Sequence, residues 1–179
     1  MKKITFIGLG VMGFPMAGHL SKNGYDVTVY NRSEEKSKLW ADQHAGTYST
    51  SINEAVKGSD IVFSCVGNDL DLRDITLGTE KAFSAMKEGS LFVDHTTTSS
   101  DIAIELHKKA QENGLYFLDA PVSGGEVGAV NGELTVMVGG ENTIFEKIKP
   151  VIAVYAKNIT LIGGSGTGQE AKMVNQICI

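Results

Sequence analysis

Near its N-terminus the chain has an apolar run, Ile4 to Ile7, that leads directly into Gly8-Leu9-Gly10-Val11-Met12-Gly13. A strand that ends in closely spaced glycines and then opens a helix leaves backbone N–H groups free, and the helix dipole favours an anion there. Gly8 would permit the tight turn, Gly10 the close approach of a pyrophosphate, and Gly13 the packing of helix on strand. An ordinary glycine-rich turn has the same composition, but the position between two predicted strands favours a dinucleotide-binding turn.

Alternating strand and helix signals follow this turn along the whole chain. The apolar run Asp60 to Val66 is typical of a parallel strand covered on both faces. Further strands are predicted at 25–30, 47–48, 90–93, 115–118, 134–138 and 158–162. Helices are predicted at 11–23, from Ser33 onward, and at 52–57, 69–77, 80–86, 102–111, 143–153 and from about 168. The pattern predicts an α/β fold with a doubly wound, mostly parallel, Rossmann-like sheet.

In a sheet of this kind, ligands bind outside the carboxyl ends of the strands. The segments predicted to lie at that edge are Gly8 to Gly13, Asn31-Arg32-Ser33, Val66-Gly67-Asn68, Asp94-His95-Thr96 and Asp119 to Gly125. We therefore expect the chemistry of the protein to gather in these segments.

The segment after the second strand indicates which dinucleotide would bind. An NAD-binding turn usually has an acidic residue about 20 positions after the glycines, where it accepts hydrogen bonds from the ribose hydroxyls. This chain has Asn31-Arg32-Ser33 instead. A guanidinium can bind a 2′-phosphate that a carboxylate would repel, although a turn arginine can also be a solvated surface residue. We predict NADP as the cofactor, with Arg32 assisted by Ser33 and Lys36.

Composition and charge exclude several other functions. A net charge of −5 without a lysine and arginine block argues against nucleic acid or an anionic membrane as partner. No apolar stretch is long enough to span a bilayer, and Met1 leads straight into a strand without a signal sequence, so we expect a cytoplasmic protein. Cys65 and Cys178 form neither a CxxC pair nor a disulfide framework. We expect both to be buried and no metal site.

A nicotinamide cofactor transfers only hydride, so a side chain must exchange the proton. Lys172 is the candidate, because Asn175 lies on the same face of the predicted terminal helix and partial burial would lower the lysine pKa. Taken alone, a helical lysine is more often a solvated side chain. Ser123-Gly124-Gly125 offers a hydroxyl and free N–H groups to a small carboxylate, but equally suits a tight loop. Among the histidines, His95 at a strand end has the most suitable position.

The end of the chain is apolar. Met173, Val174, Ile177 and Cys178 recur at helix spacing, and no polar stop signal follows them before Ile179. Free termini are normally polar. We therefore expect the chain to be a piece of a longer protein, or a partner to cover this end.

Three motifs, in order and spread over essentially the whole chain, resemble those of the β-hydroxyacid dehydrogenases. This family includes 3-hydroxyisobutyrate dehydrogenase, tartronate semialdehyde reductase and the glyoxylate/succinic semialdehyde reductases. Gly8 to Ala17 resembles its N-terminal signature, Asp119 to Gly125 its substrate-binding motif, and Gly168 to Gln176 its catalytic motif. The resemblance implies NADP-dependent hydride transfer between a small β-hydroxy acid and the matching semialdehyde or keto acid. It implies a dinucleotide-binding domain at 1–164 and the start of an interdomain helix at 165–179.

The resemblance also implies roles for single residues in the substrate site. Lys172 would be the catalytic acid/base and Asn175 would help to hold the substrate. Ser123, Gly124 and Gly125 would bind the substrate carboxylate.

On the cofactor side, Thr96 matches a family position near the nicotinamide, and Asn31 with Arg32 matches the members that use NADPH. Val66-Gly67-Asn68 departs from the pattern, because many members have a proline-containing turn there. This departure leaves the subgroup and the substrate open.

Members of the family continue from the lysine helix into an all-α domain that closes the substrate cleft and forms much of the dimer interface. That domain is absent from this chain, so we expect NADPH binding with little or no turnover, and a homo-oligomer in the full-length form. Two alternatives are an enzyme like 6-phosphogluconate dehydrogenase, which shares the fold and the lysine, and a non-catalytic NADP-binding or interaction module.

Overall fold

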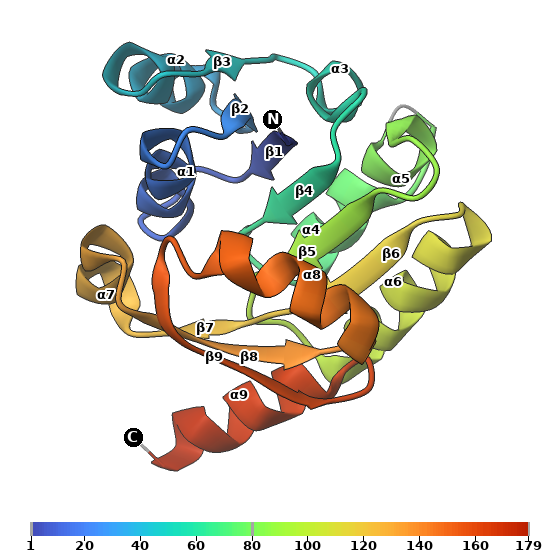
Figure 1. Ribbon diagram of the computed structural model, residues 1–179. Helices are drawn as coiled ribbons and strands as arrows, with labels where there is room; N and C mark the ends of the chain where they lie inside the picture. The colour runs from blue at the N-terminus through green and yellow to red at the C-terminus, as the bar shows by residue number, and fades with distance from the viewer. Residues whose placement is uncertain (1, 80, 179) are drawn as a thin grey trace.

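The computed structural model describes residues 2–79 and 81–178, and within them the strands form one sheet (Figure 1). The strands are β1 (Lys3–Ile7), β2 (Asp26–Tyr30), β3 (Thr47–Tyr48), β4 (Ile61–Ser64), β5 (Leu91–Asp94), β6 (Tyr116–Asp119), β7 (Val122–Ser123), β8 (Leu134–Gly139) and β9 (Ala156–Gly163). Their order is β3-β2-β1-β4-β5-β6-β8-β7, with β9 pairing to β8. The strands from β3 to β6 are parallel, while β8 runs antiparallel to β6 and β7. The predicted fold class is confirmed.

Helices cover both faces of this sheet. They are α1 (Gly13–Lys22), α2 (Glu34–Gln43), α3 (Ile52–Val56), α4 (Asp69–Thr76), α5 (Ala82–Ala85), α6 (Ser100–Glu112), α7 (Gly125–Asn131), α8 (Asn142–Ile152) and α9 (Thr167–Cys178). The apolar residues of α1, α2, α7 and α8 pack on one face, and those of α3 to α6 on the other. In Figure 1, α8 accordingly lies in front of the sheet, with α4 and α6 behind it.

The central strands supply side chains to both layers because successive residues of a strand point to opposite faces. Phe6 and Phe63 belong to one core, with their rings stacked 5.9 Å apart. Val62 and Phe92 belong to the other. Burial on both faces explains why these strands read as continuous apolar runs in the sequence.

Helix α9 is held against β6, β8 and α6 at the lower edge of the view in Figure 1. It begins beside the carboxyl end of β6. The packing therefore brings the residues of this last helix to the sheet edge at which the sequence places the ligand site.

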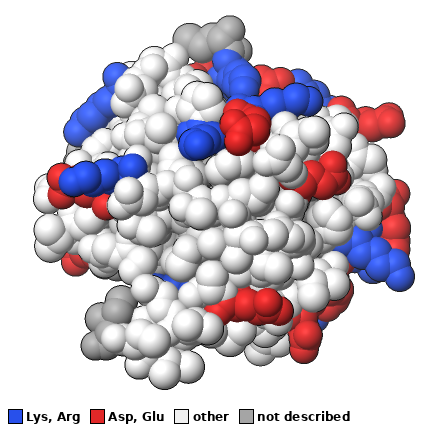
Figure 2. Space-filling model, turned by 60° about the horizontal axis from the view of Figure 1, so that its bottom comes forward, with Lys and Arg blue, Asp and Glu red and all other residues white. Residues whose placement is uncertain are grey.

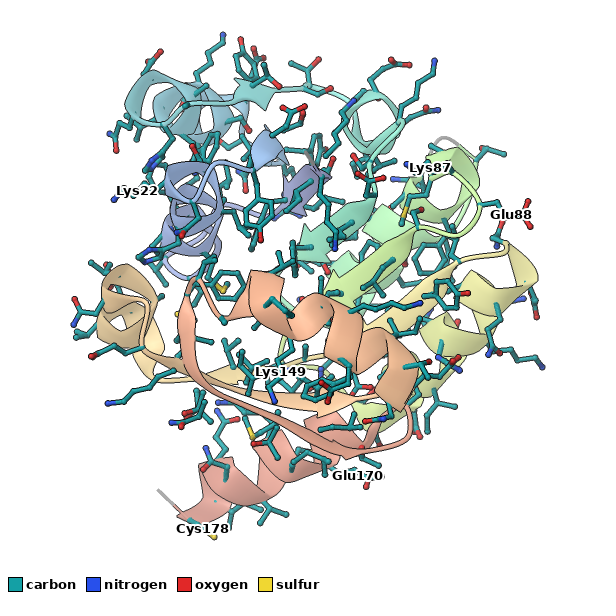
Figure 3. The ribbon with its side chains drawn as sticks, in the orientation of Figure 1. Lys22, Lys87, Glu88, Lys149, Glu170 and Cys178 are labelled. Carbon is teal, nitrogen blue, oxygen red and sulfur yellow. The ribbon has the colours of Figure 1, made fainter. Side chains whose placement is uncertain are left out.

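The structure corrects the predicted elements at several points. The sequence pattern predicts neither strand β7 nor helix α7, which lie within and directly after the segment Asp119 to Gly125. The helix expected at 80–86 is shorter, at Ala82–Ala85, and Glu80 lies outside the described residues. Cys178, expected to be buried, is exposed near the end of α9 (Figure 3), as are Val174 and Ile177 of the same helix. Ile179 also lies outside the described residues.

None of the helices in the described part of the chain combines the length and the apolar character needed to cross a bilayer.

Candidate dinucleotide and substrate site

The three glycines of the first turn occupy different surroundings. Gly8 has a φ of +94°, and a Cβ there would overlap the carbonyl oxygen of Cys65. A Cβ on Gly13 would overlap the carbonyl oxygen of Gly8, so the close contact between α1 and β1 requires glycine. A Cβ on Gly10 would meet nothing within 4 Å. Gly8 and Gly13 are thus required by the fold, whereas Gly10 faces open space.

Several backbone N–H groups of this turn have no hydrogen-bond acceptor among the described residues. Gly8 N–H donates to the carbonyl of Tyr30 at 2.9 Å, and Leu9 N–H donates to Oδ1 of Asn31 at 2.9 Å. The N–H groups of Gly10, Val11 and Met12 donate to no other described residue. Free donors beside open space, at the start of a helix, fit a pyrophosphate.

The first pocket, of about 540 Å³, extends from this turn between β2 and α4. Its charged lining residues are Arg32, Lys36, Lys81, Asp71 and Asp74. The side chain of Arg32 is 89% exposed and reaches Asp71, with 3.3 Å between Nη1 and Oδ1. The pocket therefore pairs a glycine turn for a pyrophosphate with several cations at its other end.

The second pocket, of about 400 Å³, adjoins the first. Both are lined by Met12, Cys65, Val66 and Gly67, so the two form one continuous depression along the carboxyl ends of β1, β4, β5 and β7. Beyond the shared residues, the second pocket is lined by His95, Thr96, Thr97, Val122, Ser123, Gly124, Gly125 and Lys172. This shape fits an extended ligand with a reacting end near Lys172.

The far end of the second pocket brings together residues from β7, α7 and α9. Nδ2 of Asn175 donates to Oγ of Ser123 at 3.3 Å, and Lys172, one turn earlier on α9, lines the pocket. Glu170 is exposed and lies on the outer side of α9 (Figure 3). The N–H groups of Gly124 and Gly125 donate to no other described residue. Two residues 52 positions apart in the sequence thus meet at the end of the second pocket.

Two buried polar residues, Asp119 and Gln169, fix α9 in this position, and no sequence pattern predicts a role for either one. Asp119, at the end of β6, accepts from Gly166 N–H at 2.8 Å and from Gln169 N–H at 3.1 Å. Burial raises the pKa of Asp119, and these N–H groups act in the opposite direction. The Gln169 amide donates to Thr96 O at 2.7 Å and accepts from Thr98 N–H at 3.0 Å. The carboxyl end of β6 and the loop after β5 are therefore both tied to the lysine helix.

Asp94 organises the loops that line the shared part of the pockets. Its Oδ1 accepts from Ser64 Oγ at 2.7 Å, Thr96 Oγ1 at 2.6 Å and Thr96 N–H at 3.1 Å. Thr96 Oγ1 in turn accepts from Val66 N–H at 3.1 Å. Burial raises the pKa of Asp94 to about 7, against the effect of these hydrogen bonds. Thr96 lines the pocket, but its hydroxyl is already engaged on both sides.

Two other titratable groups that line the second pocket, His95 and Cys65, are held neutral. Burial lowers the pKa of His95 to about 4, and its ring nitrogens lie 2.6 Å from Ala120 O and 2.9 Å from the Tyr155 hydroxyl. Burial also raises the pKa of Cys65 to about 12. His95 is therefore a structural residue between two partners, and Cys65 is a thiol at neutral pH.

On the face shown in Figure 2, basic and acidic side chains are interspersed around an area without charged residues. This face therefore carries neither a predominantly positive nor a predominantly negative surface. Within residues 2–79 and 81–178, no three histidine, cysteine, aspartate or glutamate side chains gather as a metal site would require.

Comparison with known proteins identifies the family. Residues 3–163 match the family described as the NAD binding domain of 6-phosphogluconate dehydrogenase. The chain belongs to this family of NAD-binding domains. The fold, the glycine turn and the match together confirm the resemblance that the three motifs predicted.

Several relatives of this NAD-binding domain are oxidoreductases by name. It is 53% identical over its full length to an uncharacterized oxidoreductase of Shewanella frigidimarina, of which it covers 62%. It is 36% identical to the 2-hydroxy-3-oxopropionate reductase of Escherichia coli, over 99% of this chain and 60% of that protein. A solved structure of Mycobacterium tuberculosis 3-hydroxyisobutyrate dehydrogenase with L-serine superposes with a TM-score of 0.94 at 34% identity, covering 99% of this chain and 60% of the other. The chain thus spans about three fifths of the length of these relatives.

The NAD-binding domain brings most of the predicted site residues to one of the two pockets. Gly8, Gly10, Val11, Met12, Gly13, Asn31, Arg32, Ser33, Val66 and Gly67 line the first; Thr96, Ser123, Gly124, Gly125 and Lys172 line the second. Three predicted residues line neither. Leu9 is buried and its N–H donates to Asn31, Asn68 caps α4 through Oδ1, and Asn175 donates to the hydroxyl of Ser123. Ser33 is the N-cap residue of α2 but makes no capping hydrogen bond there.

Proposed function

We propose that this chain is the cofactor-binding part of an NADP-dependent oxidoreductase that transfers hydride between the nicotinamide and a small β-hydroxy acid or the matching semialdehyde or keto acid. The observation that carries the proposal is the continuous pair of pockets. The glycine turn lines the first pocket, and Lys172 and Ser123 both line the second. The names of the relatives support the same chemistry, since one reduces a small oxo acid and another is a dehydrogenase solved with the small carboxylate L-serine.

The choice of NADP over NAD rests on the charges of the first pocket. The lining includes Arg32, Lys36 and Lys81, and the segment after β2 has no carboxylate that would receive a ribose 2′-hydroxyl. A guanidinium binds a phosphate with paired hydrogen bonds. These cations support binding of a 2′-phosphate at this end of the pocket.

The chain's own residues would supply everything but the hydride. When bound, the nicotinamide gives or accepts that hydride. Lys172 exchanges a proton with the oxygen of the reacting carbon. The pKa of Cys65, raised to about 12, and that of His95, lowered to about 4, lie too far from neutral pH for either group to do so efficiently. Ser123, oriented by Asn175, and the free N–H groups of Gly124 and Gly125 bind the carboxylate and orient the substrate.

The alternative of an enzyme like 6-phosphogluconate dehydrogenase has support from the family description. A phosphorylated sugar acid would need further cations in the second pocket. Among the described residues that line it, Lys172 is the one cation. The lining therefore favours a small substrate without a phosphate.

Lys172 provides the test of this function. In a version of the protein as long as its relatives, Lys172→Ala should lower kcat for NADPH-dependent reduction of 2-hydroxy-3-oxopropionate or related semialdehydes by about 100-fold or more, with the affinity for NADPH retained. Glu170→Ala, on the outer side of the same helix, is the matched control and should keep its activity.

Three outcomes would overturn parts of the proposal. Unchanged turnover in Lys172→Ala would reject its role as acid/base. Turnover of 6-phosphogluconate instead would establish the alternative enzyme, and NADPH binding without any turnover would establish a binding module. The chain of residues 1–179 alone should bind NADPH with little or no turnover, because closure around the substrate excludes water and fixes geometry.

A further inference from the structure

Arg32, the residue proposed to bind the 2′-phosphate, forms an ion pair with another residue that lines the first pocket. Arg32 follows β2, and Asp71 lies on α4, 39 residues further along the chain. The distance from Nη1 of Arg32 to Oδ1 of Asp71 is 3.3 Å, and both residues line the pocket. The cation on which the NADP proposal depends therefore already has an anionic partner.

The carboxylate is the better fixed member of this pair. Asp71 N–H donates to the capping oxygen of Asn68 at 3.0 Å, which fixes the first turn of α4. The Asp71 carboxylate packs against Gly67, where a Cβ would overlap Oδ2. Its side chain is 33% exposed, against 89% for Arg32. An anionic ligand that binds Arg32 therefore breaks the ion pair, and the negative charge of the Asp71 carboxylate then lies next to the negative charge of the ligand.

The same arrangement recurs one turn later on α4. Asp74 pairs with Lys81 at 3.2 Å, and both also line the pocket. Of the three cations in the lining, only Lys36 forms no ion pair with a described residue. Helix α4 thus presents two carboxylates to a pocket proposed to bind a phosphate.

Resting on the proposed NADP function, we propose that Asp71 is a specificity-determining counter-ion, which holds Arg32 in the free protein and is exchanged for the 2′-phosphate when NADP binds. Breaking an exposed ion pair costs about 0.2 to 1 kcal/mol, which corresponds to roughly a 1.4- to fivefold change in affinity. A ligand without the 2′-phosphate has no reason to break the pair. Asp71 therefore limits the affinity for NADP while leaving that for NAD unchanged.

The test uses two probes that differ only in the 2′-phosphate, 2′,5′-ADP and 5′-ADP, titrated calorimetrically into the chain of residues 1–179. Asp71→Asn should tighten the binding of 2′,5′-ADP about 1.4- to fivefold and leave that of 5′-ADP unchanged. Asp42→Asn, which removes the same charge from an exposed position of α2 outside the pocket, should change neither. Thermal unfolding of each variant shows that it is folded.

A double-mutant cycle with Arg32→Ala separates counter-ion exchange from general charge repulsion. In the Arg32→Ala background, Asp71→Asn should give a clearly smaller gain for 2′,5′-ADP. Three results would overturn the counter-ion role. The gain in affinity for 2′,5′-ADP could be equal in both backgrounds, or there could be no gain in either. A loss of affinity would show instead that Asp71 pre-orients Arg32 for binding. The wild-type chain tests the NADP proposal separately, because equal affinity for the two probes would contradict NADP preference whatever Asp71→Asn does.

Discussion

The glycines of the first turn show how one motif contains residues of different kinds. Gly8 and Gly13 are each confined by neighbouring backbone, so a side chain at either position would force the strand, the turn or the helix apart. Gly10 has open space beside it, on the side of the pocket. The sequence motif cannot separate the two kinds, because it records only that glycine is present.

This difference predicts opposite results for two alanine variants. Gly10→Ala should unfold in urea within about 0.5 kcal/mol of wild type, since the new methyl group meets nothing, yet bind NADPH about tenfold or more weakly because the methyl lies where a pyrophosphate would approach. Gly13→Ala should be destabilised by about 1 to 3 kcal/mol, because its methyl overlaps the Gly8 carbonyl. Urea unfolding and calorimetry measure both quantities. Wild-type NADPH affinity in Gly10→Ala would show that the phosphate lies elsewhere.

At the scale of elements, α9 depends on polar contacts that reach it from two strand ends. Asp119 accepts from the N–H groups of Gly166, directly before α9, and of Gln169. The Gln169 side chain ties the helix to the loop that contains Thr96 and Thr98. Because Lys172 lies one turn after Gln169, the loop and the lysine are held to the same helix. Gln169 thus acts as a positioning residue for the second pocket.

Gln169→Leu should disturb the second pocket and spare the first. Thr96 O and Thr98 N–H would lose their partner inside the protein, which should lower the free energy of unfolding by about 2 kcal/mol or more. NADPH, which would occupy both pockets, should bind more weakly, while 2′,5′-ADP, which needs only the first, should bind as in wild type. Glu170→Leu, at the neighbouring exposed position, serves as control. Equal loss of affinity for both ligands would show that Gln169 supports the domain as a whole.

For the whole molecule, the sequence was a good guide wherever a pattern is local. A parallel strand buried on both faces is recognisable from a few consecutive apolar residues, and a phosphate-binding turn from a few closely spaced glycines. The sheet and many of the residues that line the pockets could therefore be predicted. Strand β7 has two residues and no periodicity, and α7 contains Gly128 and β-branched valines, which are poor helix formers. The partners of Asp71, Asp119 and Gln169 lie between 39 and 73 residues away, so their roles required the fold.

The stability of the whole molecule should depend on pH through Asp94, which lies buried at the carboxyl end of β5 with Oδ2 unpartnered among the described atoms. Its pKa is about 7 in the folded protein, because burial disfavours the carboxylate, and about 3.9 in an unfolded chain. Between these values the folded state holds a proton that the unfolded state has lost. This contribution is therefore complete below about pH 4 and is lost as the pH rises to 7, by up to about 4 kcal/mol.

Asp94→Asn removes this titration while keeping an oxygen that can accept from Ser64 and Thr96. Measured by urea unfolding, the stability of the variant relative to wild type should therefore rise between pH 5 and pH 8. Other groups, such as His95, titrate in both proteins and cancel in the difference. A difference that stays constant over this range would mean that Asp94 is already ionised at pH 5, with the three hydrogen bonds to Oδ1 outweighing the effect of burial.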